Sequence, residues 1–172
     1  RSRAAGYRIG EESLVEGVTA LECRRRSAFG NGTGVATMNE CGGRTVKIFD
    51  RLSAQVAYVM AVYRHRPQTI AALEKMVDAY AEERSSEIGE VGSDCRIVGA
   101  RFIREVRIGN GVEIDGASIL ENATLCDGAR VGVDVKAYDL IAAEGSVIDN
   151  GSIVERCFVG ESCRLDKGFT AA

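Results

Sequence analysis

Aliphatic residues recur every six positions between residues 88 and 165 of this 172-residue chain. The longest run comprises Ile141, Val147, Ile153, Val159 and Leu165, and the shorter runs comprise Val91, Ile97 and Ile103, then Ile108, Ile114 and Leu120, then Leu125 and Val131. The position four residues later is usually small, as at Cys95, Ser118 and Cys157. A period of six matches neither a helix nor a two-stranded hairpin, but it is typical of a parallel β-helix built from hexapeptides. The repeat therefore predicts short stacked strands, with the aliphatic residues in the core and the small residues at the corners.

This pattern assigns six side chains in particular to the buried interior, namely Val91, Ile97, Ile114, Val147, Ile153 and Val159. The six-residue frame slips after Ile103 and again after Leu120, and it is interrupted more widely between Val131 and Ile141. Slips in a solenoid often mark loops that carry function. An insertion at a corner explains the slips equally well, so both interpretations stay open.

The composition excludes some classes of protein. The net charge of −3 and the pI near 5.4 argue against a nucleic-acid-binding protein, because such proteins are usually basic. No apolar run approaches the roughly 18 residues that suggest a membrane span, and residues 1–10 lack the apolar core of a signal peptide. We therefore expect a cytoplasmic protein without nucleic-acid or membrane partners. The chain lacks an initial Met and starts within the pattern, so we also expect it to be a piece of a longer protein.

The chain contains six cysteines, which in a secreted protein could form disulfides. Cys95, Cys157 and Cys163 occupy the small inward position of the repeat, which favours reduced thiols in the core. There is no CxxC motif and a single histidine, which argues against a structural zinc site. We expect no metal.

Three segments of one compact domain can be distinguished, namely a partial β-helix coil with a glycine-rich hairpin at 1–49, a helical hairpin at 50–86 and the β-helix repeats at 87–172. A shorter copy of the repeat at residues 9–21 predicts the partial coil. The strands of the glycine-rich hairpin are expected at residues 35–38 and 45–49, around a Gly-Gly turn.

Helical periodicity predicts two antiparallel helices over residues 52–63 and 68–83, with Pro67 in the first turn of the second helix. We expect their apolar stripes to dock against the β-helix, because an amphipathic pair is not stable alone. The side chains expected to be buried in this way are Val56, Val59, Leu73 and Val77.

The hexapeptides of residues 9–21 and of the second half resemble the left-handed β-helix superfamily of hexapeptide-repeat transferases. This resemblance implies a mainly β fold, a left-handed parallel β-helix interrupted by an αα-hairpin. The left hand rests on the resemblance, because steric preference otherwise favours right-handed crossovers. Many members of the superfamily are trimeric acyltransferases or C-terminal domains of sugar-nucleotide pyrophosphorylases, so we expect a homotrimer.

Three further segments, 39–44, 52–58 and 63–67, are similar to an uncharacterised bacterial family of large β-helix proteins. Members are often labelled as related to UDP-N-acetylglucosamine pyrophosphorylase, and the resemblance spans most of the chain. Cys41 stands where that family is expected to have glycine. The label also implies a glycine-rich loop with a basic residue after a strand, and the sequence has no such segment.

His65 is the only histidine of the chain, and Arg64 and Arg66 flank it. The transferases that the hexapeptides resemble use a histidine as general base, so the resemblance implies a catalytic role for His65. Alternatively, the two arginines and the imidazole bind a phosphate or a carboxylate. A plain turn between two helices is the third interpretation.

The glycine-rich turn supplies further candidates for binding an anion or a substrate, namely Asn39, Glu40 and Arg44. If the helices pack over the turn, these residues join Arg64 and Arg66 in a sugar-phosphate pocket. Alternatively, Glu40 and Arg44 pair with each other as surface charges, which stabilises little.

Two functions therefore remain open. The first is a hexapeptide-repeat transferase acting on a sugar or sugar nucleotide, with acyl transfer as the reaction and acyl-CoA or a nucleotide sugar as the bound cofactor. The second is a non-catalytic β-helix scaffold or binding module of a larger sugar-nucleotide-related protein. Both imply a small anionic or phosphorylated sugar as the ligand. The first rests on resemblance at the level of the fold.

Overall fold

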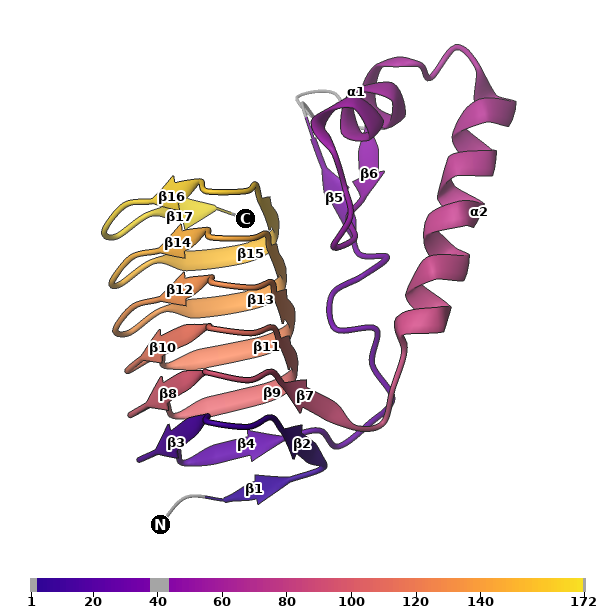
Figure 1. The fold of residues 1–172 in the computed structure, drawn as a ribbon. Coiled ribbons are helices and arrows are strands. Elements are labelled where there is room, and N and C mark those ends of the chain that lie inside the picture. The colour runs from indigo at the N-terminus through magenta and orange to yellow at the C-terminus, as the bar shows by residue number, and fades with distance from the viewer. Residues whose placement is uncertain (1–2, 38–43, 172) are drawn as a thin grey trace.

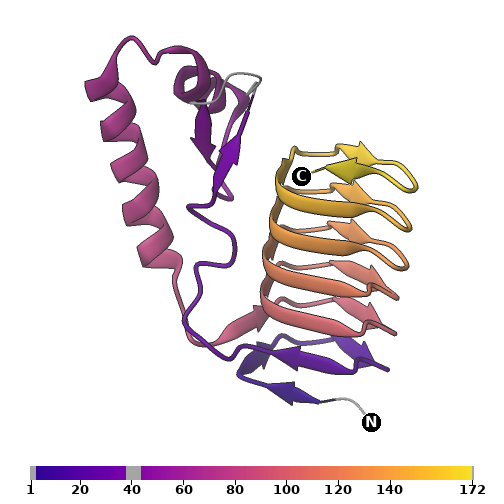
Figure 2. The same cartoon turned by 180° about the vertical axis from the view of Figure 1, so that it is seen from behind.

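The computed structural model describes residues 3–37 and 44–171, and this part of the chain is mainly β with two helices (Figure 1). Most strands lie in two parallel sheets, and a smaller unit of two strands and two helices stands beside them (Figures 1 and 2). Neither helix of the described residues combines the length and the apolar character that crossing a membrane requires.

The nine-stranded parallel sheet contains β1 (Ala4–Ala5), β2 (Tyr7–Ile9), β4 (Ala20–Glu22), β7 (Gly89–Val91), β9 (Phe102–Ile108), β11 (Ile119–Leu125), β13 (Lys136–Ala142), β15 (Ile153–Val159) and β17 (Thr170–Ala171). The six-stranded parallel sheet contains β3 (Leu14–Glu16), β8 (Arg96–Val98), β10 (Glu113–Asp115), β12 (Arg130–Val131), β14 (Val147–Ile148) and β16 (Arg164–Leu165). The smaller unit contains the antiparallel pair β5 (Gly34–Ala36) and β6 (Thr45–Lys47) and the helices α1 (Ala54–Val62) and α2 (Pro67–Arg84).

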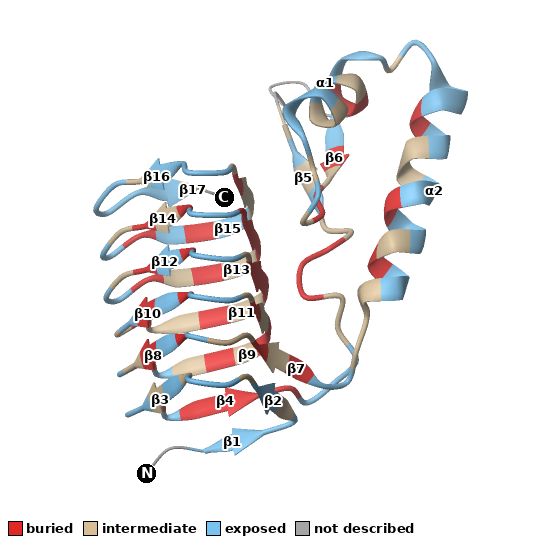
Figure 3. Ribbon diagram, in the orientation of Figure 1, coloured by how far each residue is buried: buried red, intermediate tan, exposed pale blue. Residues whose placement is uncertain are grey.

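Parallel pairing advances by 17 residues from one strand to the next, except where residues 23–88 intervene and the paired residues are 82 apart, as for Val15 and Ile97. Ile114 of β10 lies beside Ile97 of β8 and beside Val131 of β12, and Ile148 and Leu165 continue the column. We call each 17-residue repeat a rung, and the set of rungs over residues 4–22 and 89–171 the strand stack. Buried residues line the inner side of the strand stack (Figure 3).

Within a rung, the three large aliphatic side chains that point inward from the strands follow one another at intervals of six, five and six residues, and smaller core residues such as Ala100 lie between them. Ile97, Ile103 and Ile108 are at most 2% exposed, and Ile114 begins the next rung. The interval of five is therefore a regular part of every rung. The slips seen in the sequence are corners of the strand stack, so of the two interpretations left open by the sequence the structure favours the corner.

Four of the six side chains that were predicted to be buried are buried, namely Val91, Ile97, Ile114 and Val159. The prediction was wrong for Val147, which is half-buried, and for Ile153, which is 42% exposed. Their neighbours Ile148 and Val154 point inward instead and are at most 1% exposed. The inward register is therefore shifted by one residue in this part of the chain.

The shift has its origin in the rung whose inward residues are small. Ala137 and Ala142 lie in the core columns, beside Leu120 and Leu125. Alanine is small and does not stand out as a core residue in a sequence. The six-residue pattern was therefore aligned on Ile141, which points outward, and not on its neighbour Ala142. Ile141 is nevertheless fully buried, because the segment 29–31 covers it.

The smaller unit, residues 23–88, interrupts the strand stack between β4 and β7, and we call it the insert. Ser27 and Ser86 close its neck by exchanging two backbone hydrogen bonds of 3.0 Å. Because the insert leaves and returns at one corner, β7 resumes the rung beside β2.

Tyr7 fills the place where β7 diverges from β9. Its hydroxyl donates to the carbonyl oxygen of Val106 at 2.8 Å and accepts from the N–H of Val106 at 2.9 Å. Gly89 lies opposite Tyr7, and a Cβ at Gly89 would lie 2.4 Å from the phenol ring. The phenol hydroxyl thus takes the strand-pairing role at Val106, which is fully buried.

The helices pack within the insert, where Ser53 caps α1 by accepting a hydrogen bond from the N–H of Val56 at 3.3 Å. The core of the insert consists of Val46, Met60 and Ala61, with Leu52, Val56, Ala57 and Leu73 around them. The expectation that the helical stripe docks on the strand stack was wrong, because β6 offers an apolar face within the insert itself. Val77 is buried as predicted, whereas Val56, Val59 and Leu73 are only half-buried, and Met60 takes the buried position on α1.

The cysteines of the described residues are free thiols. Cys95 is buried, as predicted, and Cys157 is half-buried. Cys163 is exposed, which corrects the prediction of a core thiol. It continues the inward corner column of Cys95, but it lies on the terminal rung, which no described rung covers on that side.

Candidate functional site

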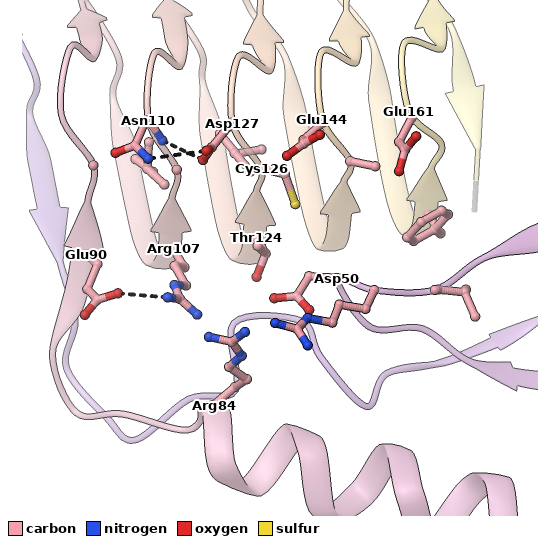
Figure 4. Close-up of a pocket in the computed structure, with 18 of the residues that line it drawn as sticks. Asp50, Arg84, Glu90, Arg107, Asn110, Thr124, Cys126, Asp127, Glu144 and Glu161 are labelled. Carbon is pink, nitrogen blue, oxygen red and sulfur yellow. Dashed lines mark hydrogen bonds and ion pairs between the residues drawn. The ribbon is translucent and has the colours of Figure 1, made fainter.

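A cleft of about 1320 Å³ lies between the insert and the strand stack. One wall comes from the insert, from residues 50–55 together with Ala57 and Arg84. The facing wall comes from successive rungs (Figure 4). The site therefore combines segments that are far apart in the sequence.

The rung wall carries a column of polar side chains, because outward positions repeat every 17 residues. This column consists of Asn110, Asp127, Glu144 and Glu161 (Figure 4). Adjacent strands lie about 4.8 Å apart, so the column offers hydrogen-bonding groups at that spacing. Asp127 accepts two hydrogen bonds from Asn110, one from its N–H at 2.8 Å and one from its side-chain amide at 3.3 Å. Within the described residues, the three carboxylates form no salt bridge.

Asp50, Tyr80 and Arg84 form a hydrogen-bonded chain on the insert wall. The Tyr80 hydroxyl donates to Oδ1 of Asp50 at 2.5 Å, and Nε of Arg84 donates to the Tyr80 oxygen at 2.9 Å. The Arg84 guanidinium also lies over the Tyr80 ring, 5.1 Å from its centroid. Burial and the bond to Asp50 raise the pKa of Tyr80, so its hydroxyl stays protonated and remains a donor.

Asn31 holds this chain against the strand stack. Its Oδ1 accepts from the N–H of Asp50 at 2.8 Å, and its Nδ2 donates to the carbonyl oxygen of Ala28 at 2.8 Å. The Thr124 hydroxyl of β11 donates to the carbonyl oxygen of Phe29 at 2.6 Å. Asn31 and Thr124 are both buried, so these bonds fix where the insert wall lies relative to the rungs.

Glycine is required where the insert touches the strand stack. Gly30 has a φ of +84°, and its N–H donates to Oδ1 of Asn122 at 3.0 Å. A Cβ at Gly30 would lie 2.9 Å from the carbonyl oxygens of Asn122 and Leu140. The backbone of the loop can therefore approach the rungs closely enough to define the cleft.

Arginines gather at the end of the cleft nearest β7. Arg107 of β9 pairs with Glu90 at 3.2 Å, and Arg8 approaches the same carboxylate at 3.8 Å. Arg84 reaches this end from the insert, and Arg51 lies with its guanidinium 5.8 Å from the centroid of the Tyr80 ring. We call Arg8, Arg51, Arg84 and Arg107 the arginine end of the cleft.

Cys126 also lines the cleft. Burial raises the pKa of its thiol to about 11, so the thiol is protonated at neutral pH. A protonated thiol is a poor nucleophile. Cys126 therefore contributes a small apolar surface to the cleft.

Comparison with known proteins places the chain in a family. A family model described as "Domain of unknown function (DUF4954)" matches residues 1–172. The chain belongs to the DUF4954 family. It is similar to an uncharacterized protein of Treponema pallidum (strain Nichols), with 24% identity over 170 residues. That alignment covers 92% of this chain and 22% of the relative, so the chain spans about a fifth of the relative's length. No solved structure matches the chain.

In this DUF4954 chain, His65 is exposed between the two helices, and its ring lies 5.5 Å from that of Tyr63. Arg64 donates to the carbonyl oxygen of Thr45 and pairs with Glu74 at 3.7 Å. The charge of Arg64 is thus already engaged within the insert. A phosphate at the tip of the helices would have to compete with Glu74.

The remaining predicted site residues are spread over the insert. Arg66 is exposed at the N-terminal cap of α2, and Arg44 is exposed beside β6, where its carbonyl oxygen accepts from the N–H of Thr37 at 2.9 Å. Asn39 and Glu40 lie outside the described residues. Of the predicted site residues in the described part of the chain, none lines the cleft.

Sequence reasoning missed the residues that form the cleft, above all Asp50, Arg84 and Arg107. The one sequence signal for the rung wall is the interval of 17 residues between the members of the polar column. That interval has meaning only once the length of a rung is known. Within residues 3–37 and 44–171, no group of three or more His, Cys, Asp or Glu side chains is arranged to hold a metal ion.

Proposed function

We propose that this domain is a binding module for a sugar or a sugar nucleotide, and that the ligand occupies the cleft between the insert and the strand stack. The observation that carries the proposal is that the polar column and the arginine end line one cleft of about 1320 Å³. Ligand sites are usually concave and combine apolar surface with a few placed polar groups. This cleft has both.

Carboxylates and amides suit sugar hydroxyls, because a carboxylate accepts from two donors and an amide both donates and accepts. Within the described residues, the side chains of Glu144 and Glu161 accept no hydrogen bond, and each oxygen of Asp127 accepts a single one from Asn110, so all three carboxylates can accept further hydrogen bonds from a ligand. Phe158 lines the same cleft and offers an aromatic ring on which a sugar or a base can pack. These features favour a ligand with several hydroxyls and a flat ring.

The test is a binding screen of neutral sugars, sugar phosphates and nucleotide sugars against the 172-residue chain, read by ligand-observed NMR and by calorimetry. The double variant Asp127→Asn, Glu144→Gln should lower the affinity for the sugar by at least tenfold, which corresponds to about 1.4 kcal/mol of binding free energy. Asp115→Asn is the matched control, because Asp115 is exposed on β10 and does not line the cleft. Equal affinity of the double variant and the control would exclude this cleft as the sugar site.

We further propose that the strand stack is a left-handed parallel β-helix of the hexapeptide superfamily. The support is the inward spacing of six, five and six residues and the parallel register of successive rungs. A crystal structure decides the hand of the connections between strands. A right-handed solenoid would remove the superfamily from consideration.

Acyl transfer is the second candidate function, and the position of Asp50 favours it. The cleft contains no imidazole among the described residues, so a carboxylate would have to serve as general base. Asp50 lines the cleft and is held in place by Tyr80 and Asn31. Release of thiol from acetyl-CoA in the presence of a sugar acceptor should be lost in Asp50→Asn and kept in Asp115→Asn. Loss in His65→Ala instead would move the reaction to the tip of the helices.

A further inference from the structure

Arg84 and Arg107 approach the same space from opposite walls of the cleft. Figure 4 shows the guanidinium of Arg107 extending from the strand stack toward that of Arg84, which extends from the end of α2. A residue of its own wall orients each guanidinium. Arg107 forms a salt bridge with Glu90 at 3.2 Å, and Nε of Arg84 donates to the Tyr80 hydroxyl at 2.9 Å. The two groups are therefore oriented before any ligand arrives.

Both guanidinium groups keep free donors. A guanidinium has five N–H donors in a planar fork, and Tyr80 uses the Nε donor of Arg84. Within the described residues, Arg84 forms no salt bridge, so its terminal nitrogen atoms are open to the cleft. Arg107 has Glu90 as its carboxylate partner, and that carboxylate is shared with Arg8.

The local charge is positive. The arginine end has four guanidinium groups, whereas the carboxylates that line this end are Asp50 and Glu90, and Glu83 lies near Arg84 outside the lining. One oxygen of Asp50 is occupied by the Tyr80 hydroxyl. An anion that enters this end therefore meets an excess of positive charge in a partly enclosed cleft, where electrostatic attraction is stronger than in open water.

We propose that Arg84 and Arg107 form a subsite for the phosphoryl group of the ligand, which rests on the proposed binding of a sugar in this cleft. Guanidinium groups bind phosphate oxygens in a bidentate manner, and two of them on opposite walls can grip different oxygens of one phosphate or of a pyrophosphate. The ligand class is then a sugar phosphate or a nucleotide sugar.

The two ends of the cleft also orient this ligand. Asp127, Glu144 and Glu161 repel an anion, so the phosphoryl group stays at the arginine end while hydroxyls follow the polar column. One arginine belongs to the insert and the other to the strand stack, so the bound phosphoryl group links the two walls.

The subsite is tested by calorimetric titration of inorganic pyrophosphate into the 172-residue chain. Arg84→Gln and Arg107→Gln should each weaken binding by at least tenfold, and the loss should shrink as salt is added. Arg84→Lys and Arg107→Lys keep the positive charge but lose the planar guanidinium with its paired donors. Their pyrophosphate affinities should therefore lie between those of the wild type and the glutamine variants. Arg66→Gln is the matched control, because Arg66 is an exposed arginine outside the cleft.

Unchanged pyrophosphate affinity in both glutamine variants, or a loss in Arg66→Gln alone, overturns the subsite. Thermal unfolding of each variant separates loss of binding from loss of folding, and the lysine variants keep the test decisive if a glutamine variant does not fold. Neutral sugars distinguish the two proposals. Binding of a neutral sugar without any binding of pyrophosphate overturns the phosphoryl subsite alone, whereas no binding of any sugar, phosphorylated or not, overturns the proposed function.

Discussion

Replacing Tyr7 by Phe removes one oxygen atom at the point where the insert leaves the strand stack. That oxygen makes two hydrogen bonds, at 2.8 and 2.9 Å, to the backbone of Val106. Burial raises the pKa of Tyr7 above its ordinary value, so the hydroxyl is protonated and able to donate at neutral pH. Tyr7→Phe therefore leaves the N–H and the carbonyl oxygen of Val106 without their partner.

The magnitude follows from the burial of Val106, which is 0% exposed. A buried polar group without a partner costs about 1–3 kcal/mol, and here two groups lose their partner. Tyr7 itself is half-buried, so water can reach part of the vacated space and recover part of this cost. We expect the free energy of unfolding to fall by about 2 kcal/mol, which lowers the melting temperature by about 4–8 °C in a domain of this size.

The assay is thermal and urea unfolding followed by circular dichroism. Tyr58→Phe is the matched control, because Tyr58 is 58% exposed and its hydroxyl forms no hydrogen bond within the described residues. The control should have the same melting temperature as the wild type. If Tyr7→Phe also melts within about 1 °C of the wild type, the phenol hydroxyl does not replace strand pairing at Val106.

Three further outcomes are expected. Met60→Asp places an unpaired charge at a fully buried position of the insert core, so the free energy of unfolding measured with urea should fall by about 4 kcal/mol. An unchanged midpoint of urea unfolding would show that the helices are loosely attached. Because burial raises the pKa of Cys126 to about 11, the fraction of its thiolate is small at pH 8, so iodoacetamide followed by mass spectrometry should label the exposed Cys163 well before Cys126; faster labelling of Cys126 would contradict this order. We also expect a homotrimer through the outward faces of the rungs, and a monomer by light scattering at micromolar concentration would contradict it without affecting the fold, because neighbouring rungs of one chain bury the core between them.

The repeat in the sequence was sufficient to predict stacked strands, because each core position is marked by its own side chain. Ile97, Ile103 and Ile108 identify one rung by their aliphatic character alone. The same logic failed at Ala137 and Ala142, because small core residues look like corner residues in a sequence. The six-residue pattern therefore assigned Ile141 to the core of the strand stack, although Ile141 points outward and is buried by the insert.

Local periodicity likewise predicted the two helices within a few residues of their ends, because helix formation depends on neighbouring residues and on Pro67. It did not predict what the helices pack against. Met60 faces β6, and the choice between β6 and the strand stack depends on the shape of the whole insert. Packing partners are a property of three-dimensional arrangement, which helical spacing does not contain.

The candidate site shows most clearly the difference between what neighbouring residues in the sequence predict and what the three-dimensional arrangement decides. Arg64, His65 and Arg66 attracted attention because they are adjacent in the sequence, yet Arg64 is paired with Glu74 and the ring of His65 lies beside that of Tyr63. Arg84 and Arg107 are separated in the sequence by β7 and β8, and no local pattern links them. They face each other because the insert leaves and re-enters the strand stack at one corner and is held there by Gly30 and Asn31. The sequence by itself determined which segments form strands and helices, since those depend on nearby residues, whereas the tertiary structure alone decided which charges share a cleft.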